Sequence, residues 1–264
     1  MRLSYILMDR LTTLNPAELA RIFTLLRSIG YQGVELNLTA PLGIELDELE
    51  KLLEQSGLVI PSFLTGEAYN DGLCLSSSDA KRRDGAVERL ISYLPIARRF
   101  KSILVVGLLQ GLRRDEPDPA VAHRRIVAGL KQVAQAAEAA QVEFVIEPVN
   151  HLQVGFHNSV AEVLSLIDEI GSPAIHPMVD TIHMNIEEAS LIEPIVRCGS
   201  RLRHVHLCEN HGGQFGTGLI DFASVLQCLK QTGYQGFGSV KVYRDLPLAV
   251  AAQTSWDHLR RVSV

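Results

Sequence analysis

The chain alternates eight times between a short apolar run and a longer amphipathic stretch, and this alternation limits the folds open to it. The apolar runs are residues 5–8, 33–38, 58–64, 103–109, 142–149, 174–179, 202–207 and 237–243. The amphipathic stretches that follow them are residues 16–28, 46–55, 79–99, 120–139, 160–170, 187–198, 222–231 and 246–261. Several runs, such as Ile103-Leu-Val-Val, are apolar on both faces, which is typical of parallel strands covered by helices. We therefore predict an α/β fold, a (β/α)8 TIM barrel, in preference to a doubly wound open sheet.

Length and composition agree with one barrel. The chain has 264 residues, of which 47% are hydrophobic, and barrels of this length are routinely a single domain. We expect one domain over residues 1–264, and no G-x-G-x-x-G or P-loop pattern supports an open sheet. The formal charge of −5 and the lack of a Lys/Arg-rich block argue against a nucleic-acid partner or an anionic membrane surface. The expected partner is a small molecule.

Four cysteines are spread along the chain without a C-x-x-C spacing: Cys74, Cys198, Cys208 and Cys228. This pattern is typical of reduced, buried thiols rather than of a disulfide framework or a zinc knuckle. The apolar stretch at the N-terminus is too short for the core of a signal peptide, and no run approaches the length that crosses a bilayer. A cytoplasmic location without membrane attachment is therefore the expectation.

Three polar residues stand at the downstream ends of strand-like runs: Glu147, Asp180 and His206. Side chains alternate along a strand, so Glu147 shares a face with Val145, and His206 shares one with His204. If these faces point to the barrel axis, the three side chains converge where barrel enzymes place their active sites. Two carboxylates and an imidazole suit a divalent ion such as Mn²⁺, Co²⁺, Mg²⁺ or Zn²⁺. The competing interpretation is a set of buried polar groups that satisfy their own hydrogen bonds, as we expect for His204.

Specific motifs in the second half of the chain carry a resemblance to a known family. They are Asp180-Thr-Ile-His-Met-Asn-Ile-Glu-Glu, Glu147-Pro-Val-Asn, His206-Leu-Cys-Glu-Asn and Gly233-Tyr-Gln-Gly-Phe. With these motifs the chain resembles the xylose-isomerase-like TIM-barrel superfamily and, within it, the ketose 3-epimerases. The resemblance covers nearly the whole chain in the order of its elements.

The resemblance implies a divalent ion held by Glu, Asp, His and a last Glu, with the substrate's carbonyl and a neighbouring hydroxyl on the ion. Such an ion polarises the carbonyl, the neighbouring C–H bond becomes acidic, and carboxylates move the proton through an enediolate. Carried over by position, Glu147 is a ligand and the candidate base, and Asp180 and His206 are further ligands. His183 is a contact to a substrate oxygen, and Glu35, in the second run, lines the same mouth.

Lys241 departs from the family pattern. The alignment of Gly-Tyr-x-Gly-x-x-Ser-Val places it where the family carries its final glutamate, and a protonated ammonium group repels a metal ion. Three outcomes are open. Lys241 is deprotonated and acts as a catalytic base or ligand, it replaces the metal by pairing with Glu147 and Asp180, or it swings outward and leaves a three-ligand ion. Gln153 and Gly212 also stand where ketose 3-epimerases usually carry a Glu and an Arg that grip the substrate, so a different substrate is expected.

Two connections are long enough to cover a substrate: residues 65–78, after the third run, and residues 209–220, after the seventh. The second contains the stretch His211-Gly-Gly-Gln-Phe-Gly-Thr-Gly. Both lie at the end of the barrel where such enzymes place their loops. We expect substrate contacts from Glu209 and His211, and the alternative is that both segments are solvated connections.

The leading functional prediction is a carbohydrate isomerase or epimerase that acts on a sugar, cyclitol or sugar acid by metal-assisted proton transfer through an enediolate. A keto-cyclitol or keto-acid dehydratase shares its first step. A second class is a metal-free sugar-binding barrel in which Lys241 replaces the cation. A DNA-repair endonuclease on this fold is disfavoured by the negative charge and by too few suitably placed ligands for a multi-zinc site. Pairing into homo-oligomers is a general expectation for such barrels.

Overall fold

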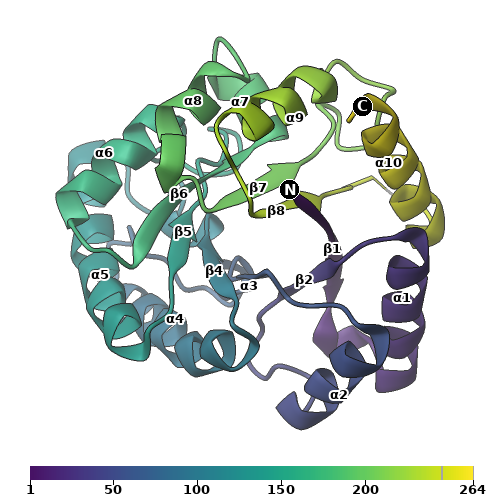
Figure 1. The fold of residues 1–264 in the computed structure, drawn as a ribbon. Helices are drawn as coiled ribbons and strands as arrows, with labels where there is room; N and C mark the ends of the chain where they lie inside the picture. The colour runs from purple at the N-terminus through teal and green to yellow at the C-terminus, as the bar shows by residue number, and fades with distance from the viewer. Residues whose placement is uncertain (245, 264) are drawn as a thin grey trace.

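The barrel expected from the sequence is present as a closed sheet of eight parallel strands. The computed structural model describes residues 1–244 and 246–263. Each strand pairs with the next along the chain, and β8 pairs with β1 (Figure 1). The strands are β1 Arg2–Arg10, β2 Gly33–Asn37, β3 Ser62–Leu64, β4 Ile103–Val106, β5 Phe144–Ile146, β6 Ile175–Asp180, β7 His204–Leu207 and β8 Phe237–Val240. The prediction of an α/β TIM barrel is therefore confirmed.

Helices form a ring around the sheet, and α10 lies beside α1 where the ring closes (Figure 1). The helices are α1 Pro16–Ile29, α2 Leu46–Ser56, α3 Glu67–Asn70, α4 Ala80–Phe100, α5 Pro119–Ala140, α6 Val160–Ile170, α7 Thr181–Glu187, α8 Glu193–Cys198, α9 Phe222–Gln231 and α10 Leu248–Val262. Local chemistry sets their ends: α6 begins with a capping box between Ser159 and Glu162 and ends at Gly171, whose φ is 71°. Within the described residues, no helix combines the length and apolar character needed to span a membrane.

The main difference from the predicted elements is α7, which begins directly after β6. We expected the helix after this strand to cover residues 187–198, whereas the structure has α7 at Thr181–Glu187 and a shorter α8 from residue 193. Asp180 gives the reason, because its Oδ1 accepts a hydrogen bond from the Ile182 backbone N–H at 3.0 Å. The last residue of the strand is thus also the N-cap of the helix. The spacing of hydrophobic residues does not show that the last residue of a strand is also the N-cap of the next helix.

The interior of the barrel has two contrasting sides beneath its carboxyl end. One side is an apolar cluster on β4, β5 and β6, which we call the apolar floor: Val105, Val145 and Met178. The other side carries buried polar groups on β2, β7 and β8, which we call the polar floor: Glu35, His204 and Ser239. The larger hydrophobic core lies between the strands and the helices. The side chains that come next along these strands therefore lie above an apolar layer on one side of the barrel and above a polar layer on the other.

Candidate active site

Polar side chains from four strand ends meet above these floors. Glu147 directly follows β5, Asp180 ends β6, and His206 lies in β7, where it is paired with Asp180. The Nδ1 atom of His206 lies 3.1 Å from Glu147 Oε1 and 3.5 Å from Asp180 Oδ2. The structure thus brings together the three residues that we expected to converge. With Lys241 they form what we call the upper cluster.

Lys241 directly follows β8 and points into the site. Its backbone N–H donates to the carbonyl of Leu207 at 2.9 Å, which extends the ladder between β7 and β8. Its Nζ lies 2.8 Å from Asp180 Oδ2 and 3.4 Å from Glu147 Oε1. The ring of Tyr243 lies near the same ammonium group, with its centroid 4.9 Å from Nζ. The outward-swung arrangement is therefore not the one that the structure shows.

His183, on the first turn of α7, faces the same two carboxylates. Its Nε2 lies 3.7 Å from both Glu147 Oε1 and Asp180 Oδ2. The amide Nδ2 of Asn150 donates to Nδ1 of His183 at 2.8 Å, which leaves Nε2 to carry the ring proton. Burial lowers the pKa of His183, so the neutral ring is favoured. Asn150 belongs to a motif that we singled out, but sequence reasoning gave it no role.

Glu35 does not line the mouth of the barrel, and this expectation is corrected. Its carboxylate is fully buried in the polar floor, where it accepts from His204 Nε2 at 2.7 Å and from His206 Nε2 at 3.1 Å. The hydroxyl of Ser239 donates to the same carboxylate. Burial alone would raise the pKa of Glu35, but His204 and His206 hold it well below its usual value. Glu35 is therefore an internal counter-ion, and His204 is a buried histidine whose Nε2 pairs with it.

The buried charges of the upper cluster support one another. Burial would raise the pKa of Glu147, but Lys241 and His206 lower it to about 2. Burial would likewise raise the pKa of Asp180, which Lys241 holds well below its usual value. Burial would lower the pKa of Lys241, yet Asp180 and Glu147 raise it well above its usual value. The upper cluster thus holds two carboxylates against a charged ammonium group.

His206 connects the two layers. Its Nδ1 faces Glu147 and Asp180, and its Nε2 faces Glu35. Burial would lower the pKa of His206, but Glu35 and the contacts to Asp180 and Glu147 raise it well above the usual value. The raised pKa favours the protonated ring, and each ring nitrogen faces a carboxylate.

Among the residues that the structure describes, two groups of side chains have the composition and spacing to hold a metal ion. They are Glu35, His204 and His206, and Glu147, Asp180 and His183. In the second group the fit fails at Lys241, because its Nζ lies 2.8 Å from Asp180 Oδ2 and 3.4 Å from Glu147 Oε1, where an ion bound to both carboxylates would meet its charge. A divalent ion and an ammonium at a separation of about 4 Å repel by about 8 kcal/mol, even with an effective dielectric constant near 20. The carboxylates and His206 suit a divalent ion, but the whole set does not fit one while Lys241 stands between them.

The loop of residues 209–220 uses the two side chains that we expected to touch substrate. Glu209 is fully buried, and its carboxylate accepts from the backbone N–H groups of Gly216 and Ile220, each at 3.0 Å. His211 accepts from the Gly213 N–H at 3.1 Å, and its Nε2 lies 3.1 Å from a threonine hydroxyl of the loop. These side chains therefore shape the loop, and substrate contacts from Glu209 and His211 stay predictions. The sequence could not show that the loop carries unpaired N–H groups that need an internal acceptor.

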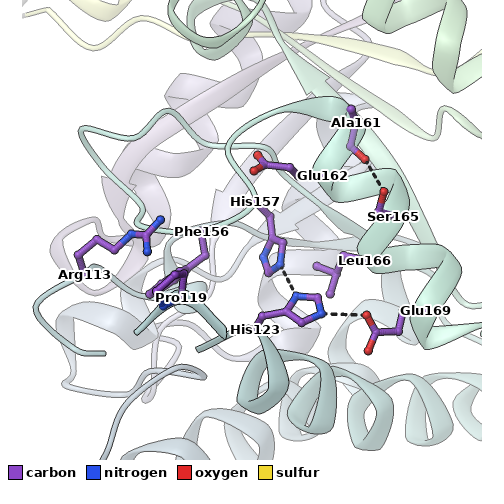
Figure 2. A pocket seen from close by; sticks show the side chains of 10 residues that line it. All are labelled: Arg113, Pro119, His123, Phe156, His157, Ala161, Glu162, Ser165, Leu166 and Glu169. Carbon is purple, nitrogen blue, oxygen red and sulfur yellow. Dashed lines mark hydrogen bonds and ion pairs between the residues drawn. The ribbon is translucent and has the colours of Figure 1, made fainter. Parts of the chain in front are cut away.

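A cavity of about 410 Å³ lies outside the barrel wall, between α5 and α6. Figure 2 shows a chain of hydrogen bonds along it: His123 bonds Glu169 at 2.8 Å and His157 at 2.9 Å. The Nδ1 atom of His157 lies 2.8 Å from Gln110 Oε1, and Gln110 reaches the Glu147 carbonyl at 3.4 Å. Burial and His123 lower the pKa of His157 to about 4. The hydrogen-bond chain thus runs from the cavity to the backbone of Glu147, whereas no side chain of the upper cluster lines the cavity.

Comparison with known proteins assigns the family. The model of the xylose isomerase-like TIM barrel family matches residues 23–262. The chain is 31% identical to an L-ribulose 3-epimerase of Mesorhizobium japonicum over 221 residues, which are 83% of this chain and 73% of that protein. It is 30% identical to an L-ribulose 3-epimerase of a Methylomonas species, over 78% of this chain and 72% of that protein. A solved structure of an L-ribulose 3-epimerase superposes with a TM-score of 0.85 at 25% identity and covers 99% of this chain and 95% of its own. The chain belongs to the xylose isomerase-like TIM barrel family.

Membership of the xylose isomerase-like TIM barrel family bears out the resemblance, including the similarity to ketose 3-epimerases. The prediction of an enzyme of the isomerase and epimerase class is confirmed at that level. The roles of the individual site residues stay predictions. Lys241 is the residue that makes this site differ from one in which every side chain could be a metal ligand.

Proposed function

We propose that the protein is a carbohydrate epimerase or isomerase that moves a proton at the carbon next to a sugar carbonyl. The observation that carries this proposal is the convergence of Glu147 and Asp180 with Lys241 at the carboxyl end of the barrel. A carboxylate can remove an acidic proton, and a buried cation can stabilise the oxyanion that results. The relatives named L-ribulose 3-epimerase support a ketose as the substrate class.

Exposure within the upper cluster suggests which groups a substrate meets first. The side chains of Glu147 and Lys241 are 9% and 8% exposed, whereas Asp180 and His206 are fully buried. We therefore assign the base to Glu147 and the oxyanion contact to Lys241. Asp180 and His206 hold these two groups in place through charge.

The proton transfer balances with the residues of the chain. The Glu147 carboxylate takes the proton from the carbon beside the carbonyl, the C–H electron pair becomes the carbon–carbon double bond, and the carbonyl electron pair moves to oxygen. The ammonium of Lys241 and the Nε2–H of His183 donate hydrogen bonds to that oxygen. Protonation of the same carbon on the opposite face by a water molecule, whose hydroxide then takes the proton held by Glu147, gives the epimer. Return of the proton from Glu147 to the neighbouring carbon gives the isomer, provided that the hydroxyl proton of that carbon passes to the former carbonyl oxygen. No step requires a redox partner.

A non-catalytic sugar-binding barrel is the second candidate, and one observation favours it. The ion pair between Lys241 Nζ and Asp180 Oδ2 at 2.8 Å satisfies the centre of the site without a substrate. A binder would hold a sugar over this pair but would not exchange its hydrogens with solvent. A cytoplasmic location and a homo-oligomeric assembly also stay predictions from the sequence.

Deuterium incorporation separates the two candidates. The protein is incubated in deuterated water with a panel of ketoses, including ribulose, and hydrogens next to the carbonyl are followed by NMR. An epimerase labels that carbon and produces a second sugar, which chromatography detects. Glu147→Gln should abolish both, and Glu143→Gln, an exposed glutamate before β5, is the matched control. A sugar that stabilises the folded protein against heat but never acquires deuterium would support the binder instead.

A further inference from the structure

We propose that the ammonium group of Lys241 is the resident cation of this site and takes the place of a divalent metal ion. The catalytic part of the inference, that this ammonium stabilises the oxyanion, rests on the proposed epimerase function. The structural part does not, because it concerns only which cation the site accepts.

The position of Lys241 is built into the barrel. Its backbone extends the ladder between β7 and β8, and its side chain follows Ser239 on the inward face of that strand. Nζ contacts Asp180 at 2.8 Å and Glu147 at 3.4 Å, and the side chain is only 8% exposed. A surface lysine that meets an acid by chance has neither this burial nor two carboxylate partners.

The surroundings of Lys241 keep the arrangement that a metal site needs. His206 directs Nδ1 at Glu147 and receives support on Nε2 from Glu35, as metal-binding histidines commonly do. Glu147 and Asp180 supply two carboxylates on the same side. Metal binding would require His206 to give up a ring proton, as histidine ligands do, whereas Lys241 brings a positive charge and has no free lone pair. Lys241 is therefore the residue that separates this site from one built to hold an ion.

Charge balance leads to the same conclusion. Three buried carboxylates lie in the two layers: Glu35, Glu147 and Asp180. Lys241 lies within ion-pair distance of two of them, with Nζ 2.8 Å from Asp180 and 3.4 Å from Glu147. A buried charge without a partner is costly, and Lys241 supplies to Asp180 and Glu147 the partner that an ion would otherwise provide.

The test measures metal binding without any sugar. The wild-type protein is treated with EDTA, dialysed and titrated with Mn²⁺ by calorimetry and by electron paramagnetic resonance. We expect no stoichiometric metal in the purified protein and no Mn²⁺ binding tighter than about millimolar, whereas Lys241→Glu should bind at least about 100-fold more tightly. Lys230→Glu, which changes an exposed lysine on α9 in the same way, should bind no better than the wild type. Stoichiometric metal or micromolar binding in the wild-type protein would overturn the inference.

A second measurement covers failure of Lys241→Glu to fold. Thermal unfolding of the wild-type protein should be unchanged by EDTA and by millimolar Mn²⁺, because no folded-state site stabilises through the ion. A melting temperature that falls with EDTA and is restored by Mn²⁺ would contradict the inference by itself. These results are independent of the substrate. Deuterium exchange that EDTA abolishes would support the epimerase and refute the role of Lys241, and failure of exchange with every sugar would count against the epimerase alone.

Discussion

The four residues of the upper cluster lie above different floors. Each of them follows, two positions along its strand, a residue whose side chain points to the same face. Glu147 stands above Val145, and Asp180 stands above Met178 of the apolar floor. His206 and Lys241 instead stand above the polar floor, which contains Glu35.

The apolar floor offers the two carboxylates no counter-ion from below, so they depend on the cations across the barrel. One of those cations is His206, which lies above the polar floor, where Glu35 raises its pKa. The acids and the cations of this site are therefore charged for different reasons. Lys241 is the link between them, since it stands beside the polar floor but pairs with acids above the apolar one.

The largest effect is expected at Glu147. Glu147→Gln preserves the shape of the side chain but removes the base, so proton exchange should fall about a thousandfold. Deuterium incorporation into the best ketose of the panel measures the change. A variant that keeps more than about a tenth of the rate would show that another group is the base and would assign the acids above the apolar floor a structural role only.

The next effect is expected at Glu35, in the polar floor. Glu35→Gln leaves His204 and His206 without their buried counter-ion, so we expect a loss of about 3 kcal/mol in the free energy of unfolding at pH 6. Urea denaturation measures it, with Glu54→Gln, an exposed residue of α2, as the control. An unchanged midpoint would mean that the polar floor does not depend on this charge.

The pH dependence of that loss has a definite sign. The lowered pKa of Glu35 contributes stability that is present above its usual value of 4.5 and is lost as the pH falls below it. The raised pKa of His206 contributes stability that is complete below its usual value of 6.5 and is lost as the pH rises through the folded value. The deficit of Glu35→Gln should therefore be largest between pH 4.5 and 6.5 and should shrink on both sides. A deficit that stays constant from pH 4 to 9 would contradict the paired-charge account.

Sequence reasoning found the site residues whose direction follows from the alternation of side chains along a strand. Alternation along a strand fixes that Glu147 shares a face with Val145 and that His206 shares one with His204, so their convergence follows once the strands close into a barrel. Sequence reasoning missed the contacts between side chains that form only when the barrel closes. Glu35 meets His204 across 169 positions of the chain, and no local pattern encodes that contact. The structural use of Glu209 is hidden for a related reason, because its partners are backbone N–H groups whose need for an acceptor depends on the loop's shape.

The smallest effect is expected from the apolar floor. Val145→Ala removes two methyl groups from a fully buried position, so the free energy of unfolding should fall by roughly 2 kcal/mol, within the range of small cavities. The loss should be nearly the same from pH 4 to 9, because no charge is removed, and proton exchange should stay within about threefold of the wild type. Urea denaturation and deuterium incorporation check the two parts. A strongly pH-dependent loss would show that Val145 acts by keeping water from Glu147, which would join the two floors in one electrostatic unit instead of separating them.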